Sequence, residues 1–243
     1  MLTEIHKDKR KTVGIIGGMG PAATALLFQK MIAYTDAAKD SEHIHIIIDN
    51  CTSIPDRTAA ILKGDDTPAK AICEIGRKLE AYGAELLAIP CNTSHYYYSY
   101  IQQQLNVPVM NMIEETAKEC ILQGYHKVGV LATTGTCQTG TYDKELNKHG
   151  IEVFYPDEEG QIRLMEIIYD QIKAGKEINT GIFESYLREM KQRGAEAFIL
   201  GCTELPMAFS QGDYGCCFID SLDILAKRTV EKAGFQIKIV GDK

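Results

Sequence analysis

GAELLAIPCNT (residues 83–93) and GAEAFILGCTE (residues 194–204) follow one pattern: Gly-Ala-Glu, a short apolar run, a cysteine and then polar residues. The two cysteines, Cys91 and Cys202, fall in register at an offset of 202 − 91 = 111 residues. A short apolar run of this kind is typical of a buried strand in a parallel sheet. Each segment therefore predicts a buried strand that ends at a cysteine.

Two further pairs of segments extend this similarity outward. KVGVLATTG (127–135) resembles TVGIIGGMG (12–20) at an offset of 127 − 12 = 115, and FIDSLDILA (218–226) resembles VMNMIEETA (109–117) at 218 − 109 = 109. Three similarities in the same order at similar offsets predict two copies of one α/β unit, related by a pseudo-twofold axis. Chance similarity between ordinary βα units is the alternative. Under duplication, the two cysteines lie at equivalent places on a shared cleft.

Short apolar runs alternate with longer segments of helical period along the whole chain. This alternation predicts βαβ units, an α/β fold and parallel sheets. We expect two pseudo-symmetric domains with the active site in the cleft between them: residues 1–112 plus 209–243 form the first domain, and residues 113–208 form the second. Expected strands include residues 12–18, 43–49, 127–135 and 195–201, and expected later helices lie near residues 161–174, 181–193 and 222–233.

Composition excludes several classes of function. The chain has 243 residues and a formal net charge of −7, which argues against nucleic acid or an anionic membrane as the main partner, because both require clustered Lys and Arg. No apolar run approaches the ~20 residues of a membrane span. The N-terminal MLTEIHKDKRKT is charged where a signal peptide would be apolar. We therefore expect a soluble, cytoplasmic protein with most of its eight cysteines reduced.

The two cysteines occupy the positions where parallel α/β sheets gather functional groups, at the junction of a strand and the following helix. A thiol beside a helix N-terminus is more readily ionised, so it can act as a base near neutral pH. Two facing thiols suit the inversion of a stereocentre, in which one group removes a proton and the other adds one. Buried packing of small side chains is the alternative for each cysteine alone. No metal is required, and no lysine motif for pyridoxal phosphate is evident.

The glycine-rich loop offers a competing hypothesis. Gly18-Met19-Gly20-Pro21-Ala22-Ala23 fits G-x-G-x-x-A after a strand, as in dinucleotide-binding folds, and Asp49 ends the next expected strand. That acidic residue lies 49 − 18 = 31 positions on, later than the ~20 expected of such folds. The motif also leaves the paired cysteines unexplained. We therefore expect the loop and Met19 to line an amino-acid site.

Six motifs lie in order over nearly the whole chain: GIIGGMGPAAT (14–24), IPDRTAAIL (54–62), PCNTSH (90–95), MIEETAK (112–118), LATTGT (131–136) and GCTE (201–204). Together they resemble the aspartate/glutamate racemase family, and most closely its aspartate racemases. The resemblance implies two flavodoxin-like domains, a homodimer, no cofactor, and racemisation of aspartate, with glutamate second. Cys91 would serve the D-enantiomer and Cys202 the L-enantiomer.

The resemblance also implies roles for residues around the cysteines. An acidic side chain must be matched by a cation once it leaves water, and Arg57 and Lys173 match the racemase positions that would hold the distal carboxylate. Surface charges are the alternative for both. Asn92, Thr93, Ser94 and Thr203 would hold the amino-acid backbone of the substrate. Possible support comes from Asp56, which could instead cap a helix, from Glu204, which could pair with a surface cation, and from His95, which could polarise the thiol or satisfy a buried hydrogen bond.

Other functions stay open at this point. Within the superfamily they are a hydantoin racemase, a maleate isomerase or an arylmalonate decarboxylase, although the presence of both cysteines favours a racemase over the decarboxylase. A catalytically idle amino-acid-binding protein is the alternative from another class.

Overall fold

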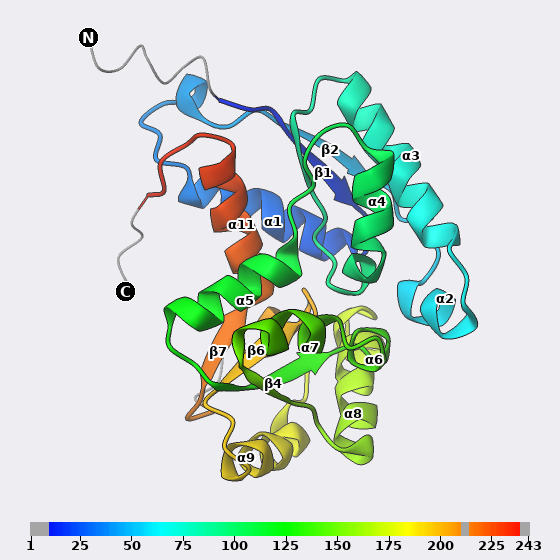
Figure 1. Ribbon diagram of the computed structural model, residues 1–243, viewed down its shortest axis with the longest axis vertical. Helices are drawn as coiled ribbons and strands as arrows, with labels where there is room; N and C mark the ends of the chain where they lie inside the picture. Colours follow the sequence, from blue (N-terminus) through cyan, green and yellow to red (C-terminus); the bar gives the residue numbers. More distant parts are fainter. Residues whose placement is uncertain (1–9, 210–213, 239–243) are drawn as a thin grey trace.

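Two parallel β-sheets, one in each half of the chain, confirm the predicted α/β architecture. The computed structural model describes residues 10–209 and 214–238 (Figure 1). Strand order is β2-β1-β3 in the first sheet and β5-β4-β6-β7 in the second, and a single parallel bridge from Leu87 to Val109 extends the first sheet. The two orders correspond strand for strand, as duplication predicts. The strands are β1 (Val13–Gly17), β2 (Ile46–Asn50), β3 (Leu86–Ala88), β4 (Lys127–Ala132), β5 (Glu152–Phe154), β6 (Ala197–Gly201) and β7 (Cys217–Asp220).

Helices cover both sheets (Figure 1), so that the central strands β1, β3, β4 and β6 are buried on both faces, as is usual for parallel sheets. The helices are α1 (Pro21–Tyr34), α2 (Arg57–Lys63), α3 (Thr67–Ala81), α4 (Tyr98–Gln104), α5 (Met112–Leu122), α6 (Thr134–Gln138), α7 (Thr141–Leu146), α8 (Glu158–Met165), α9 (Glu184–Gln192), α10 (Leu205–Phe209) and α11 (Ser221–Lys232).

The turn between β1 and α1 brings the chain to the cleft. All five residues of β1 are buried, and Ile15 and Ile16 have no exposed surface, which stabilises the fold by about 1.5–3 kcal/mol for each side chain. Gly18 follows with φ = +93°, and a Cβ at this position would lie 2.2 Å from the Cys51 carbonyl oxygen. Only glycine therefore fits the turn, which positions Met19 next to it.

The last helix of each repeat packs against the opposite half. α5 follows Val109 of the first sheet but shares a core with β4, whereas α11 follows β7 and packs on α1 (Figure 1). This packing of α5 and α11 against the opposite halves affects where the boundary between the two expected domains is placed. β7 lies within residues 209–243, assigned to the first domain, yet it hydrogen-bonds to β6 of the second sheet. We propose that the first domain resumes at Ser221.

Some predicted elements differ in detail. The strand expected at 43–49 begins at Ile46. The helix expected near 161–174 begins earlier, as α8, and continues as a π-helix, Glu166–Ile172. The polar residues after Cys91 form a 3₁₀ turn, Thr93–Tyr97, before α4 begins. The charged N-terminal stretch lies, in its first nine residues, outside the described part of the chain.

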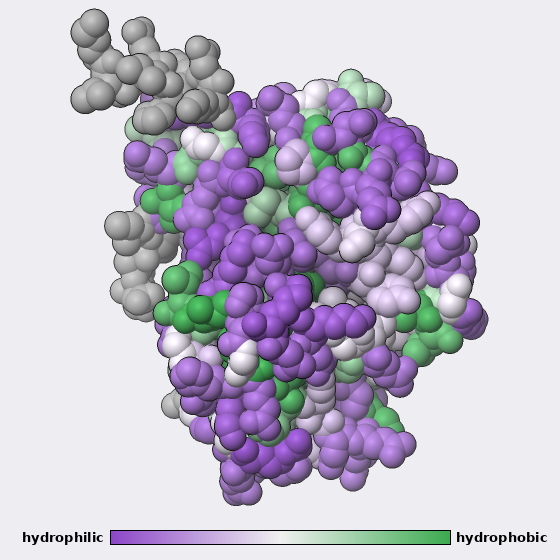
Figure 2. Space-filling model, in the orientation of Figure 1, coloured by the Kyte–Doolittle hydropathy of each residue, from purple (hydrophilic) through white to green (hydrophobic). Residues whose placement is uncertain are grey.

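The surface is largely polar. The face in Figure 2 is mostly hydrophilic, with hydrophobic residues in small separate patches. Within residues 10–209 and 214–238, none of the helices combines the length and the apolar character needed to cross a membrane.

Candidate active site

Cys91 and Cys202 line the same cavity between the two halves of the chain. Cys91 follows β3 and Cys202 follows β6, so the two cysteines occupy equivalent places in the two sheets. Their exposed fractions are only 5% and 6%. The structure therefore brings the two predicted catalytic residues together at a site that is shielded from bulk water.

The cavity is nearly closed. Its atom-free space is about 270 Å³, but only about 10 Å³ of this is wide enough for the centre of a water molecule. A single water needs about 10–15 Å³ by this measure, so the cavity must widen before an amino acid can enter. The lining consists of Met19, Asp56, Arg57, Thr58, Cys91, Asn92, Thr93, Thr133, Tyr169, Lys173, Cys202, Thr203 and Glu204.

Cys202 is held in the thiol form by its surroundings. Its Sγ donates a hydrogen bond to Glu204 Oε2 at 3.0 Å, and Glu204 is itself buried. Burial raises the pKa of Cys202 well above its ordinary value, and the charge of Glu204 raises it further, while Lys173 lowers it by less. Cys202 is therefore suited to donate a proton.

Lys173 faces the same carboxylate. Its Nζ lies 3.7 Å from Glu204 Oε1 and 4.6 Å from the centre of the Tyr169 ring. Burial lowers the pKa of Lys173, but Glu204, followed by Cys202, more than offsets this, so the pKa lies above its ordinary value. The ammonium thus stays charged, and Glu204 is its permanent partner.

The guanidinium of Arg57 is the positive charge next to Cys91. Its Nη1 donates to the carbonyls of Ile54 at 3.4 Å and Pro55 at 3.2 Å, and its Nη2 donates to the Met19 carbonyl at 3.3 Å. Its Nε is buried without a hydrogen-bond partner. Nη2 carries a second hydrogen, which, like that of Nε, is not used by these three carbonyls. A carboxylate can accept both in a bidentate pair.

The charge of Arg57 also acts on Cys91. Burial lowers the pKa of the guanidinium, but a Cys91 thiolate, followed by Asp56, more than offsets this, so the pKa of Arg57 is raised. Cys91 thus lies within the electrostatic reach of a buried cation. One cysteine therefore faces a cation, and the other donates to a carboxylate.

Asp56 links the two halves of the chain. Its Oδ1 accepts a hydrogen bond from the Ala59 amide at 2.8 Å and so caps α2, which was the alternative role for this residue. Its Oδ2 accepts one from the Tyr169 hydroxyl, in the π-helix of the second half, at 3.0 Å. Burial raises the pKa of Tyr169, so the phenol remains a donor. This hydrogen bond closes one side of the cavity.

Thr93 and Thr203, both predicted to bind substrate, line the cavity but also bond to other side chains of the site. The Thr93 hydroxyl oxygen lies 2.9 Å from that of Thr133 and 3.1 Å from that of Thr136, across the cleft. The Thr203 hydroxyl lies 3.1 Å from Glu204 Oε2. The contacts of Thr93 join the two halves, whereas that between Thr203 and Glu204 lies within the second half.

Ser94 and His95 are absent from the lining of the cavity. Ser94 Oγ donates to Met19 Sδ at 3.3 Å. His95 Nε2 lies 3.1 Å from the Met112 amide, which can only donate, so Nδ1 carries the proton and donates to the Cys91 carbonyl at 2.8 Å. Burial lowers the pKa of His95 by more than its backbone hydrogen bonds raise it. His95 therefore satisfies buried backbone groups and does not contact the thiol.

Three lining residues, Thr58, Thr133 and Tyr169, were not predicted. Thr133 had a usable signal, because it follows β4 as Gly18 follows β1, at the same offset of 133 − 18 = 115. Thr58 follows Arg57 within a motif already identified. No sequence pattern indicated Tyr169, because the π-helix changes which side chains face the cleft.

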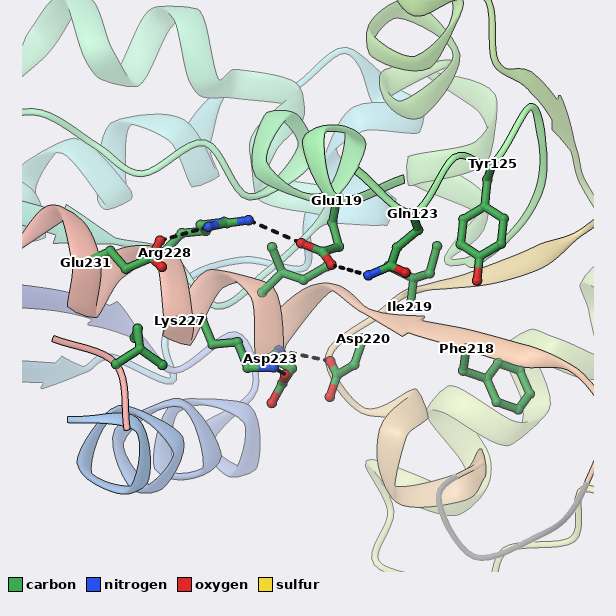
Figure 3. A pocket seen from close by; sticks show the side chains of 12 residues that line it. Glu119, Gln123, Tyr125, Phe218, Ile219, Asp220, Asp223, Lys227, Arg228 and Glu231 are labelled. Carbon is green, nitrogen blue, oxygen red and sulfur yellow. Dashed lines mark hydrogen bonds and ion pairs between the residues drawn. The ribbon is translucent and has the colours of Figure 1, made fainter. Parts of the chain in front are cut away.

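A second pocket, on α5, β7 and α11, differs in character (Figure 3). Arg228 pairs there with Glu119 and Glu231, and Lys227 pairs with Asp223. Charges that are already paired with one another leave little for a ligand. In the part of the chain that the structure describes, no group of three or more His, Cys, Asp or Glu side chains is arranged to hold a metal ion.

Comparison with known proteins identifies relatives over nearly the whole chain. The profile of the Asp/Glu/Hydantoin racemase family matches residues 16–229. The broad specificity amino-acid racemase RacX of Bacillus subtilis is 34% identical over 229 residues, which is 90% of this chain and 96% of that protein.

Solved structures give the same result for the fold. An aspartate racemase from Picrophilus torridus is similar with a TM-score of 0.80 and 29% identity, over 94% of this chain and 96% of that one. An aspartate racemase homologue from Pyrococcus horikoshii has a TM-score of 0.75 and 31% identity, over 92% and 99% of the two chains. The predicted fold of two flavodoxin-like domains is thereby confirmed.

Proposed function

Because the chain belongs to the Asp/Glu/Hydantoin racemase family, we propose that it interconverts L- and D-aspartate, with glutamate as a second substrate, using Cys91 and Cys202 as its two acid–base groups. The predicted enzyme class, an amino-acid racemase independent of pyridoxal phosphate, is confirmed by this membership and by the racemases among its relatives. The choice of substrate and the roles of individual residues are our proposal.

The observation that carries the proposal is the contrast between the two thiols at one closed cavity. Cys91 lies beside the Arg57 guanidinium, whereas Cys202 donates to Glu204 and has a raised pKa. Racemisation by two bases needs this asymmetry, because one group must be a thiolate while the other is a thiol. Cys202 is thus suited to act as the proton donor, and we assign the role of the base to Cys91.

The reaction of the D-enantiomer then follows. Cys91 thiolate takes the α-proton from one face, and the Cys202 thiol delivers its proton to the opposite face. Lys173 stabilises the thiolate that forms at Cys202. This reaction leaves Cys91 as a thiol and Cys202 as a thiolate, which is the form that the L-enantiomer requires. Cys202 then takes the α-proton of the L-enantiomer, and Cys91 delivers its proton to the opposite face.

Acid–base catalysis alone accounts for only part of the rate. It contributes about 10²–10⁴-fold, whereas enzymes lower barriers by about 8–23 kcal/mol in total. Charges fixed in a site without bulk water supply much of the remainder. In this cavity the fixed cations are Arg57 and Lys173, which can stabilise the negative charge that develops on the substrate.

Arg57 also supports aspartate as the substrate. Its Nε–Nη2 edge retains two donors for a distal carboxylate, whereas Lys173 is already paired with Glu204. We therefore assign the distal carboxylate mainly to Arg57 and give Lys173 a smaller share.

A racemase of broad specificity is the second candidate, and the similarity to the Bacillus subtilis protein favours it. A chiral assay of both enantiomers of aspartate, glutamate, alanine and lysine separates the two candidates. Turnover of aspartate well above alanine and lysine supports our proposal, comparable turnover of all four supports broad specificity, and turnover of none contradicts both. Added pyridoxal phosphate or a chelator should leave the rates unchanged. A homodimer in the cytoplasm remains a prediction.

Replacing Glu204 with glutamine should lower the pKa of Cys202, because a neighbouring negative charge is removed. The acid form of Cys202 is complete below that pKa and is lost as the pH rises through it. In E204Q, the alkaline limb of kcat for D-aspartate should therefore move to lower pH, as pH–rate profiles would record. Glu189→Gln, at an exposed pair with Arg193, is the control and should shift nothing. An E204Q limb that stays in place would contradict this account.

Replacing Tyr169 with phenylalanine should weaken closure, because the hydrogen bond to Asp56 across the cleft is lost. A hydrogen bond to a charged group is worth about 1.5–3 kcal/mol, so we expect KM to rise roughly 10- to 100-fold with a smaller change in kcat. Tyr98→Phe, which removes a hydrogen bond to Val109 within the first half, is the matched control. If steady-state kinetics give the two variants the same KM, Tyr169 has no role in closure.

A further inference from the structure

The side chain of Asn92 belongs to a buried chain of hydrogen bonds. The Tyr142 hydroxyl lies 2.7 Å from Asn92 Oδ1, Asn92 Nδ2 lies 3.0 Å from Ser221 Oγ, and Ser221 Oγ lies 2.7 Å from the Leu200 carbonyl. Tyr142 and Ser221 have no exposed surface, and Asn92 is 2% exposed. This series of hydrogen bonds is therefore shielded from bulk water.

The direction of each bond follows from counting hydrogens. Ser221 has one hydroxyl hydrogen, and the Leu200 carbonyl can only accept it, so Ser221 Oγ must accept from Asn92. The Asn92 amide nitrogen thus faces Ser221 and its oxygen faces Tyr142, which must donate. Burial raises the pKa of Tyr142, which keeps that phenol protonated. Only one orientation of the Asn92 amide satisfies all three groups.

This chain of bonds joins the two segments that carry the cysteines. Asn92 directly follows Cys91, and Leu200 lies in β6, two residues before Cys202. Tyr142 is in α7, in the second half, and Ser221 is the first residue of α11. The bonds therefore bridge the two halves of the chain behind the cavity that Asn92 lines.

One hydrogen of Asn92 Nδ2 has no assigned acceptor, because Ser221 takes the other. From this we infer that Tyr142 and Ser221 are positioning residues, which fix the Asn92 amide so that its remaining N–H donates to the carboxylate of an amino acid in the cavity. Neither residue lines the cavity, and neither contacts substrate. The inference rests on the proposed racemase function, and it assigns a role to two residues that no sequence motif indicated.

A double-mutant cycle tests whether Tyr142 acts through Asn92. Removing the Tyr142 hydroxyl leaves Asn92 Oδ1 unpaired and the amide free to turn, so Y142F should lower kcat/KM for both enantiomers about tenfold, mainly through KM. In N92A the amide is absent, and the same Tyr142→Phe change should alter kcat/KM less than about twofold. A purely structural tyrosine would act equally in both backgrounds, and that result would overturn the inference.

Tyr155→Phe is the matched control. It removes a tyrosine hydroxyl that donates to Asp143 within the second half, away from the cavity. It should leave kcat/KM unchanged in both backgrounds, even if both tyrosine variants melt at lower temperature. An equal loss of kcat/KM in Y155F and Y142F would also overturn the inference.

A second measurement does not depend on turnover. In ¹⁵N-labelled protein, the Asn92 side-chain NH₂ signal is identified by its absence from N92A, and its hydrogens should exchange with water slowly. Exchange should become faster in Y142F but not in Y155F, whereas equal exchange in all three proteins overturns the inference. A wild-type protein that racemises no amino acid would refute the proposed function alone, since this exchange pattern would still be measured.

Discussion

Serine in place of Cys91 should reduce kcat for aspartate racemisation by about 10²–10⁴-fold or more, which is the contribution expected of a general acid or base. The hydroxyl is nearly the same size as the thiol but far harder to ionise, so the site keeps its shape and loses its base. Cys202→Ser should have an effect of the same order, because each thiol acts once in each direction. Chiral chromatography of reactions started from L- and from D-aspartate measures both rates.

Thermodynamics adds a stricter requirement to this prediction. The two enantiomers have equal free energy in water, so kcat/KM must fall by the same factor in both directions for each variant. Cys217→Ser, at an exposed cysteine of β7, is the control and should retain wild-type rates. Near-normal turnover in either active-site variant would remove that cysteine from the mechanism.

Alanine in place of Arg57 should lower kcat/KM for aspartate by about 10²-fold, because removing one partner of a buried charge pair costs about 2–5 kcal/mol. The loss for L-alanine as substrate should be smaller, since L-alanine has no distal carboxylate. Steady-state kinetics with both substrates measure the difference. Part of the loss will be common to both, because Arg57 also faces Cys91.

Lysine at position 57 is the control for charge alone. It keeps the cation but lacks the planar pair of donors, so Arg57→Lys should recover only part of the activity with aspartate. Equal losses for aspartate and alanine in R57A would limit Arg57 to supporting the Cys91 thiolate and would leave the distal carboxylate without an assigned partner.

Much of the fold follows from the sequence because burial on both faces imposes a simple pattern. The strands expected at 12–18 and 195–201 locate β1 and β6, and the internal similarity anticipates the matching strand orders of the two sheets. The exchange of α5 and α11 between the halves was only partly foreseen. Local pattern cannot show which core a helix joins, since an apolar face fits either one.

The sequence predicted some residues of the site but not others. Cys91 and Cys202 were identified because duplication places them at equivalent strand ends, and Arg57 because a motif contains it. The two partners of Asn92, Tyr142 and Ser221, carried no signal, since hydrogen bonds between residues 50 and 129 positions apart depend on tertiary structure. A single sequence shows which polar residues exist, but it does not show which of them face one another.

Deuterium incorporation during racemisation of L-aspartate in D₂O tests the two-cysteine mechanism most directly. Thiols exchange their protons rapidly with solvent, so the cysteine that delivers the proton carries deuterium. If Cys202 and Cys91 act on opposite faces, the first D-aspartate formed should be fully deuterated at Cα, while the recovered L-aspartate keeps its proton. D-aspartate that retains a substantial share of the original proton would mean that a single base serves both faces, and that result would contradict the mechanism proposed here.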